Sequence, residues 1–287
     1  MPEMPEVESL AQFLTERCVG RAVARVELVA VSALNTYDPP LSALHGLEIE
    51  SVTRHGKFLD LSAQGLHLVF HLARAGWLRW RESLPETPAK PGKGPLAVRV
   101  RLDDGSGFDL TEAGTQRKLA VYVVANPQDI PMVATLGPDP MNPEFDQAAL
   151  QGVLAHAGRS QIKGVLKDQR ILAGIGNAYS DEILHAARLS PFKPSNSLSE
   201  TELSTLYGAI KGELAGAIAR AEGLAAKDLK GEKKSGLRVH GRKGQPCDVC
   251  GDTIAEVSFS DSALQYCPTC QTGGKKLADR RLSKLLK

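Results

Sequence analysis

The hydrophobic pattern of this chain changes once, at a proline-rich stretch, and this change limits the folds available to it. Before residue 136, short runs alternate apolar and polar side chains, as strands do, whereas after residue 145 apolar residues recur at helical spacing. The stretch LGPDPMNPEFD between them carries three prolines that interrupt regular structure. A chain of 287 residues is long enough for two domains. We therefore expect a multi-domain α+β protein with a linker at residues 136–145.

Residues 1–135 are expected to form a β-sandwich preceded by one amphipathic helix. After the opening MPEMPEVESL, apolar residues from Val7 to Cys18 recur at helical spacing, and Gly20 is a typical helix stop. Short strands with turns such as Asp104-Gly105 favour a sandwich over βαβ units. The predicted strands are residues 22–28, Leu47–Val52, Lys57–Leu61, Leu66–Leu72, Leu96–Leu102 and Leu119–Val124.

Residues 146–240 are expected to form a helical domain. Ser199 and Glu202 match a capping box at the start of the longest predicted helix, which carries one apolar stripe. The predicted helices are Phe145–Ala157, Ile162–Gln169, Ala178–Arg188 and Glu200–Glu222.

Four of the five cysteines form two close pairs with the spacing C-x2-C-x16-C-x2-C. They are Cys247, Cys250, Cys267 and Cys270. Four thiolates complete a closed tetrahedral shell, so the pattern predicts one structural Zn²⁺ in a zinc ribbon at residues 241–272. The alternative is two disulfides or unpaired cysteines, which the spacing and a reducing compartment disfavour. Cys18 stands alone and is expected to be a buried apolar residue.

The charge of the chain is unevenly distributed. From Ala225 to Lys287, 13 Lys and Arg face 7 Asp and Glu, although the net charge of the whole chain is only +2. A basic carboxy-terminal region indicates either a polyanionic partner or simply a solvated charged face. The acidic start does not resemble a signal peptide, and no apolar run is long enough to span a membrane. We expect a cytoplasmic protein with a basic tail at residues 273–287.

Several motifs, in order along the chain, resemble the formamidopyrimidine-DNA glycosylase and endonuclease VIII family of bacterial DNA-repair enzymes. They are Pro2-Glu3 with PEVE, RHGKFL, HLARAG, LGPDP, IKGVLKDQRILAGIGNAYSDEIL, VHGRKGQPC and the zinc ribbon. The resemblance implies an N-terminal β-sandwich, a helix-two-turn-helix domain and a zinc finger. It also implies a bacterial, nucleoid-associated monomer that binds damaged double-stranded DNA.

The resemblance implies catalytic roles for Pro2, Glu3 and Lys57. Once Met1 is removed, the secondary amine of Pro2 would attack C1′ of the damaged nucleotide. An α-amino group has a reference pKa of about 7.7–8.0, so a useful fraction is unprotonated at cellular pH. Glu3 would transfer protons during ring opening and base loss. Lys57 would contact phosphate, although by itself it could equally be a solvated surface lysine.

The resemblance also implies DNA contacts by Lys163, Asn177 and Arg242. The Gly-rich sequence before Asn177 suits close approach of a phosphate to backbone amides, or is merely a turn between helices. At the positions where the family carries residues that fill the gap left by an extruded base, this chain has Arg74 and Lys118-Leu119. Arg74 could stack or pair with the opposite strand, or only bind phosphate.

Two departures from the family concern the substrate. The segment between Glu222 and Val239 is shorter than the family loop that covers oxidised guanine, and Ser262 stands where the family has a phosphate-binding arginine. We therefore predict a bifunctional DNA glycosylase and abasic-site lyase for oxidised or modified bases, acting through a Pro2 Schiff base with β- or β,δ-elimination. The alternative is a catalytically weak protein that binds damaged or abasic DNA.

Overall fold

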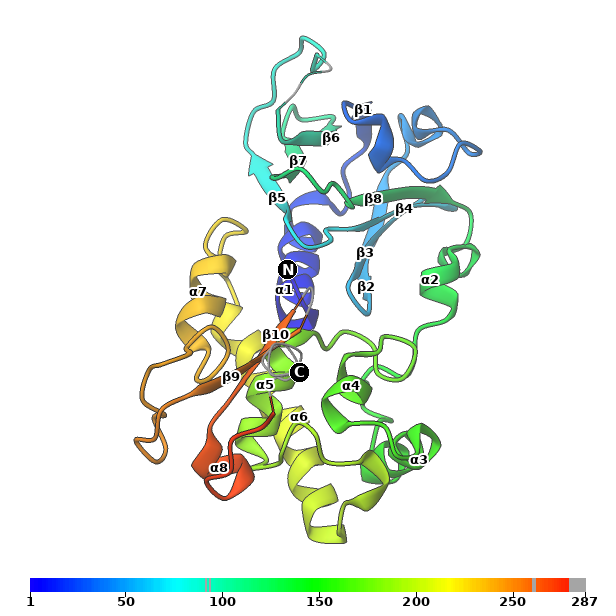
Figure 1. The fold of residues 1–287 in the computed structure, drawn as a ribbon. Helices are drawn as coiled ribbons and strands as arrows, with labels where there is room; N and C mark the ends of the chain where they lie inside the picture. Colours follow the sequence, from blue (N-terminus) through cyan, green and yellow to red (C-terminus); the bar gives the residue numbers. More distant parts are fainter. Residues whose placement is uncertain (91, 93, 260–261, 279–287) are drawn as a thin grey trace. The chain divides into compact units, whose positions relative to one another are not determined.

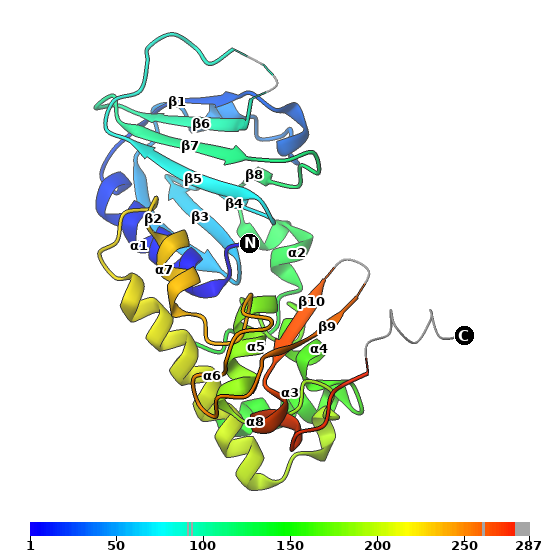
Figure 2. The same ribbon diagram turned by 60° about the vertical axis from the view of Figure 1, so that its left-hand side comes forward.

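The chain forms two compact units, which are described separately. The computed structural model describes residues 1–90, 92, 94–259 and 262–278. Unit 1 comprises Met1–Leu136 and Ala221–Glu232, and unit 2 comprises Gly137–Arg220 and the residues from Lys233 onward. Figures 1 and 2 show the elements of both.

Unit 1 is built from two four-stranded antiparallel sheets, with strand orders β1-β6-β7-β5 and β2-β3-β4-β8 (Figure 2). Its helices are α1 (Met4–Cys18), α2 (Pro131–Ala134) and the short 3₁₀ turns η1 (Val31–Ala33), η2 (Leu41–Leu44) and η3 (Pro127–Asp129). Its strands are β1 (Val23–Leu28), β2 (Ile49–His55), β3 (Phe58–Ala63), β4 (Leu66–His71), β5 (Gly76–Arg81), β6 (Leu96–Leu102), β7 (Gly107–Glu112) and β8 (Ala120–Val124).

The core of unit 1 confirms the predicted sandwich and its amphipathic helix. Leu10 and Leu14 of α1 are fully buried, in one cluster with residues of both sheets such as Leu61 and Val100. Cys18 lies in the same cluster and is fully buried, as expected. Burial raises the pKa of its thiol to about 12, so this cysteine is a core residue rather than a nucleophile.

The sequence analysis did not predict strands β5 and β7. In β7 the reason is that buried polar residues interrupt the alternation of apolar and polar side chains. All six residues of β7 are buried, including Asp109 and Glu112. Arg99 of β6 donates to both carboxylate oxygens of Asp109, at 2.7 and 3.0 Å. Glu112 accepts from the backbone N–H groups of Lys118 and Leu119 at 2.9 to 3.0 Å. Each buried carboxylate is therefore satisfied within unit 1.

Residues 221–232 belong to unit 1, which differs from the expected continuous helical domain at 146–240. Ala226 and Leu229 are buried in the core of unit 1. The indole N–H of Trp77 in β5 donates to the carbonyl of Ala226 at 2.9 Å. Burial of these apolar residues, together with a buried hydrogen bond, explains why this segment leaves the helical domain.

Unit 2 contains most of the predicted helices and the predicted ribbon. Ser199 and Glu202 make both hydrogen bonds of the capping box, which confirms that prediction. Its elements are α3 (Gln147–Ala157), α4 (Ile162–Lys167), α5 (Asn177–Ala186), η4 (Ser195–Ser197), α6 (Glu200–Ala221, whose last residue belongs to unit 1), α8 (Pro268–Thr272) and the antiparallel strands β9 (Ala255–Ser258) and β10 (Ala263–Tyr266). Helix α7 (Leu229–Gly236) begins in unit 1 and ends in unit 2.

Within the described residues, none of the helices combines the length and the apolar character that crossing a bilayer requires. Much of the expected basic tail, including Arg280, Arg281, Lys284 and Lys287, lies outside the described residues.

Gly76, at the start of β5, provides a test of the sandwich. A Cβ at this position would lie 2.0 Å from the carbonyl oxygen of Leu72. We expect Gly76→Ala to lower the free energy of unfolding by about 3 kcal/mol, because the backbone of the turn must move. Gly152→Ala is the control, since nothing lies within 4 Å of its Cβ in α3 and alanine favours a helix. Equal unfolding midpoints in urea for both variants would contradict this account.

Candidate functional site

The start of α1 holds two buried carboxylates beside Pro2. Pro2 is buried, and Glu3 and Glu6 are 2% and 3% exposed. The backbone N–H of Glu3 donates to Glu6 Oε2 at 2.8 Å, while the Glu3 carboxylate accepts from the backbone N–H of Glu6. This reciprocal capping box and the positive end of the helix dipole stabilise both charges. The carboxylate of Glu3 is thus held in a fixed position next to Pro2.

Lys57 lies in the tight turn between β2 and β3. His55 pairs with Phe58 across this turn, and Gly56 between them has a φ of +56°, which favours glycine. Arg54 connects the turn to α1, since it donates to Glu8 Oε2 at 2.7 Å and to the carbonyl of Gly56 at 3.1 Å. Lys57 itself is 7% exposed.

Helix α1 runs antiparallel to β2, so its first residues lie at the end of β2 that leads into this turn. Glu8 contacts Arg54, whereas Thr15, two turns later, contacts the carbonyl of Val52, earlier in the strand. Continuing this direction back to Glu3 leads toward the turn that carries Lys57. The start of α1, with Pro2 and Glu3, is therefore directed toward the end of the sheet where the turn carries Lys57.

The register of the same sheet brings two further predicted residues to this end of its strands. His71 of β4 pairs with Phe58 on one side and with Ala120 of β8 on the other. Arg74 follows β4 by three residues, and Lys118 precedes β8 by two. Both side chains are exposed. Lys57, Arg74 and Lys118, widely separated in sequence, thus occupy one end of one sheet.

Leu119 does not suit the role of a gap-filling residue that the sequence suggested. Its side chain is 3% exposed and belongs to the core of unit 1. Its backbone N–H is fixed by Glu112. The interpretation of Lys118-Leu119 as a pair inserted into DNA is therefore wrong for Leu119, because insertion would remove it from the core.

His71 also lies at this end of the sheet, and the sequence analysis did not single it out. Burial, and secondly the charge of Lys57, lower the pKa of His71 to about 4. Its ring lies 4.7 Å from the ring of Phe58, and its Nδ1 accepts from the backbone N–H of Ala73 at 3.2 Å. His71 is therefore neutral at neutral pH beside a cationic lysine. Only the strand register, which a sequence does not display, reveals this contact.

In unit 2, Asn177 begins α5 after a loop that Gln169 supports. The Gln169 side chain donates to the carbonyl of Ile175 at 2.7 Å and accepts from the N–H of Gly174 at 2.9 Å. Gly174 has a φ of +89°. The side chain of Asn177 donates to the carbonyl of Ala263 in β10 at 2.6 Å. The loop thus has a defined shape, and Asn177 links it to the zinc ribbon.

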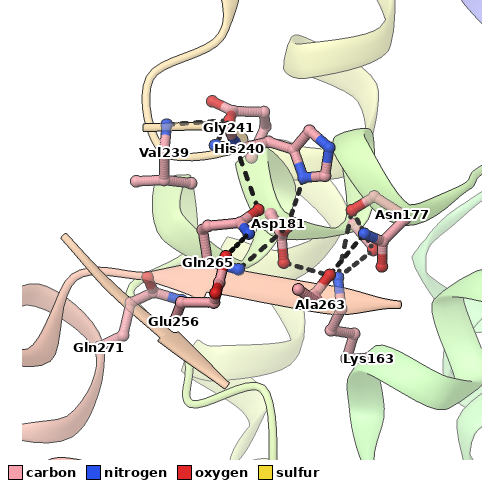
Figure 3. A network of polar contacts seen from close by, with 12 residues as sticks. Lys163, Asn177, Asp181, Val239, His240, Gly241, Glu256, Ala263, Gln265 and Gln271 are labelled. Carbon is pink, nitrogen blue, oxygen red and sulfur yellow. Dashed lines mark hydrogen bonds and ion pairs between the residues drawn. The ribbon is translucent and has the colours of Figure 1, made fainter. Parts of the chain in front are cut away.

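Lys163 lies in a buried polar network, which Figure 3 shows. Its ammonium donates to Asp181 Oδ1 at 2.6 Å, to Ser180 Oγ at 2.8 Å and to the carbonyl of Asn177 at 3.2 Å. The other oxygen of Asp181 contacts His240 Nδ1 at 2.7 Å. Lys163 is 6% exposed and Asp181 is fully buried. These contacts make Lys163 a support for the Asn177 loop.

Arg242 is engaged within the zinc ribbon region. It donates to both carboxylate oxygens of Asp248, at 2.5 and 2.9 Å, and to the carbonyl of Arg238 at 3.0 Å. The contact with Asp248 raises the pKa of Arg242. These contacts leave less of the charge of Arg242 for an external phosphate. Its role in DNA binding remains a prediction.

The four paired cysteines converge on one point. Their sulfur atoms all lie within 4.8 Å of one another, and none is in a disulfide. Cys247 and Cys270 Sγ are 3.9 Å apart, and Cys250 and Cys267 Sγ are 3.3 Å apart. A tetrahedral zinc ion with Zn–S bonds of about 2.3 Å requires sulfur separations close to these values. The cluster therefore fits one zinc ion held by four thiolates.

Comparisons with known proteins follow the same order of parts. Sequence profiles match the formamidopyrimidine-DNA glycosylase N-terminal domain at residues 1–119, the H2TH domain of the same enzymes at 136–228, and the zinc finger found in FPG and IleRS at 244–273. These parts define a DNA-repair glycosylase fold with a zinc finger.

Curated relatives identify the family. A formamidopyrimidine-DNA glycosylase of Symbiobacterium thermophilum is 35% identical over 98% of this chain and 93% of its own length. An uncharacterized formamidopyrimidine-DNA glycosylase-like protein of Mycobacterium tuberculosis is 55% identical, over 55% of this chain and 98% of its own. The chain belongs to the formamidopyrimidine-DNA glycosylase family.

Solved structures show the same fold. MutM in complex with DNA containing carbocyclic 8-oxo-G aligns with a TM-score of 0.82 at 25% identity, covering 94% of this chain and 100% of that one. Lactococcus lactis Fpg in complex with DNA containing FAPY-dG aligns with the same TM-score, identity and coverage.

His71 predicts a defined pH dependence of stability. The folded protein keeps His71 neutral down to about pH 4, whereas the unfolded chain binds a proton near pH 6.5. Stability is therefore lost as pH falls from about 6.5 to 4, by roughly 3 kcal/mol in total for this group. We expect His71→Gln to lose less stability over this range in urea unfolding, while the exposed His156→Gln retains the wild-type slope. Identical slopes in all three proteins would refute the assignment.

The buried pair of Lys163 and Asp181 gives a second test. Lys163→Met leaves the Asp181 carboxylate without its cation, and we expect a loss of about 3 kcal/mol in unfolding free energy. Lys167→Met, on the same helix, removes the same charge outside this network and serves as the control. Unchanged stability combined with weaker DNA binding in Lys163→Met would instead assign Lys163 to a DNA phosphate.

Proposed function

We propose that this chain is a bifunctional DNA glycosylase and abasic-site lyase that removes oxidised or otherwise modified bases. The observation that carries this proposal is a buried, oriented Glu3 next to Pro2 on a helix that Glu8 and Arg54 tie to the turn holding Lys57. Support also comes from the family to which the chain belongs and from its DNA-bound structural neighbours.

Removal of Met1 exposes the reactive group. The Pro2 nitrogen then becomes a secondary amine whose reference pKa, about 7.7–8.0, leaves part of it unprotonated near pH 7. The amine forms a bond to C1′ as the bond from C1′ to the base breaks, and the sugar ring opens. The resulting iminium accepts the electron pair released when a C2′ proton is removed, and the 3′-phosphate leaves. One strand is then cut by β-elimination.

Glu3 serves this sequence as the proton carrier. Its carboxylate lies beside Pro2, and its backbone N–H is fixed by Glu6, so it has little freedom to move away. A positioned acid or base contributes roughly 10²- to 10⁴-fold to such a reaction. The neutral imidazole of His71 leaves Lys57 as the adjacent cation, which is suited to a phosphate next to the damaged nucleotide.

DNA binding is proposed to use both units. In unit 2, Asn177 and the amides of its Gly-rich loop are suited to a phosphate. In unit 1, the exposed Arg74 and Lys118 are proposed to contact the strands from which the damaged base has been extruded. Extrusion costs a few kcal/mol, and least for damaged or mispaired bases. Zinc, when bound to the four cysteines, holds the ribbon that contacts Asn177 through Ala263.

Borohydride trapping on DNA with an abasic site tests the chemistry. We expect a covalent adduct whose peptide map places the DNA on the Pro2 nitrogen, and intact mass showing that Met1 is absent. Glu3→Gln should still form this adduct on abasic DNA but should release damaged bases roughly 10²- to 10⁴-fold more slowly.

Pro2→Gly is the comparison for the nucleophile, since it replaces the secondary amine with a flexible primary one. An adduct on a lysine instead of Pro2 would refute the proposed nucleophile. Binding without any adduct would favour a damaged-DNA binding protein instead. A panel of duplexes with single lesions identifies the base.

A further inference from the structure

Unit 1 contains a second feature that the proposed chemistry does not use, a cavity of about 630 Å³. Its walls come from the second half of α1, from β5 and the residue after it, and from residues 225–230. All of these segments belong to unit 1. The volume lies within the range of small-molecule sites, about 300–1,000 Å³.

The cavity has walls held by aromatic contacts. The Trp77 N–H donates to the carbonyl of Ala226, which fixes the segment 225–230 against β5. Phe13 and Trp80 meet edge to face with ring centroids 6.0 Å apart, which fixes α1 against the same strand. Trp77 and Phe13 are both 7% exposed. The cavity is therefore built into the packing of unit 1.

The lining is strongly cationic. Five basic side chains line it, against a single acidic one, Glu82. The basic residues are Arg17, Arg79, Arg81, Lys227 and Lys230. Aromatic rings position two of them, since the Arg17 guanidinium lies 4.1 Å from the centroid of Phe13 and the Lys230 ammonium lies 4.5 Å from that of Trp77.

Only part of this positive charge is compensated. Arg17 lies 3.7 Å from Glu16, and Arg81 lies 3.8 Å from Asp109. Among the residues that the structure describes, Arg79, Lys227 and Lys230 form no ion pair with an acidic side chain. Burial, and secondly the charge of Arg79, lower the pKa of Lys230. Two like charges are thus held close together, and an anion between them would relieve their repulsion.

The cavity is remote from the start of α1. Arg17 follows Glu3 by 14 residues, which corresponds to about 20 Å along a helix. None of the residues proposed above for base removal lines it. It is therefore a separate site.

We propose that this cavity binds a free nucleoside diphosphate or triphosphate. Guanidinium and ammonium groups without acidic partners match phosphate oxygens, for which arginine offers a planar pair of donors. Arg17 and Lys230 cover the buried rings of Phe13 and Trp77, so the half-buried Trp80 is the aromatic side chain of the lining that matches a flat, weakly polar base. An inorganic anion would use only the first of these features, and an extended acidic peptide would need a longer groove than this partly open pocket provides.

The two tryptophans of the chain both line this cavity, so intrinsic fluorescence reports directly on it. We expect ADP added to the full-length protein to change this fluorescence saturably, and calorimetry to give a dissociation constant below about 1 mM. Inorganic pyrophosphate should bind at least about tenfold more weakly, because it lacks the base.

A double variant, Arg79→Gln with Lys230→Gln, should weaken ADP binding at least about tenfold, since it removes two charge-assisted contacts. Both side chains are exposed, so the unfolding midpoint should stay close to that of the wild type. Lys90→Gln, an exposed lysine of unit 1 outside the cavity, should bind ADP like the wild type.

Four results would overturn the proposal. They are no ADP binding at about 1 mM, equal affinity for pyrophosphate and ADP, ADP binding that the double variant does not weaken, and binding of oligothymidylate or of a glutamate peptide in place of ADP. The last result would reassign the cavity to a DNA strand or to an acidic protein segment. Failure here leaves abasic-site trapping unaffected, because the two experiments use different residues.

Discussion

Two adjacent buried carboxylates, Asp181 and Glu182 of α5, determine the arrangement of unit 2. Asp181 accepts from Lys163 of α4, contacts His240, and accepts from the backbone N–H of Gln265 in β10 at 3.2 Å. Glu182 accepts from three successive backbone N–H groups, those of residues 238–240, at 2.8 to 3.0 Å. Two charges on one helix therefore hold another helix, the chain entering the zinc ribbon and the ribbon itself. The Asn177 loop depends on this network, because Asn177 contacts both Lys163 and β10.

Unit 1 uses the same physical device at the start of α1. Buried charge is tolerated when hydrogen bonds satisfy it, and the exchange of hydrogen bonds between Glu3 and Glu6 does so beside the helix dipole. Arg54 then connects Glu8 of the same helix to the turn before Lys57. In this way a terminus, which would ordinarily fray, is fixed to one end of a sheet. A fixed terminus suits the nucleophilic role proposed for Pro2.

Periodicity predicted those elements whose buried residues are apolar, and it failed where buried residues are polar or the partner is distant. The first helix and strands such as Leu96–Leu102 follow the simple pattern. In β7, Asp109 and Glu112 are buried because Arg99 and backbone N–H groups satisfy them, and no local pattern contains those partners. The location of residues 221–232 depends on a hydrogen bond from Trp77, about 150 residues earlier in the chain. The site motifs could be found from sequence, but their neighbour His71 required the strand register.

The basic residues of this chain differ in burial and in the place they occupy in the fold. Lys163 and Arg242 form ion pairs with Asp181 and Asp248, and the pair of Lys163 and Asp181 is buried. Arg74 and Lys118 are exposed at one end of the sheet, whereas the neighbouring Leu119 is packed in the core. A charged side chain entering a gap in a duplex must find a phosphate or a base edge to compensate its desolvation, whereas an apolar one only needs to stack. Under the function proposed above, we therefore expect Arg74 and Lys118 to discriminate the base opposite the lesion by hydrogen bonding more than by shape.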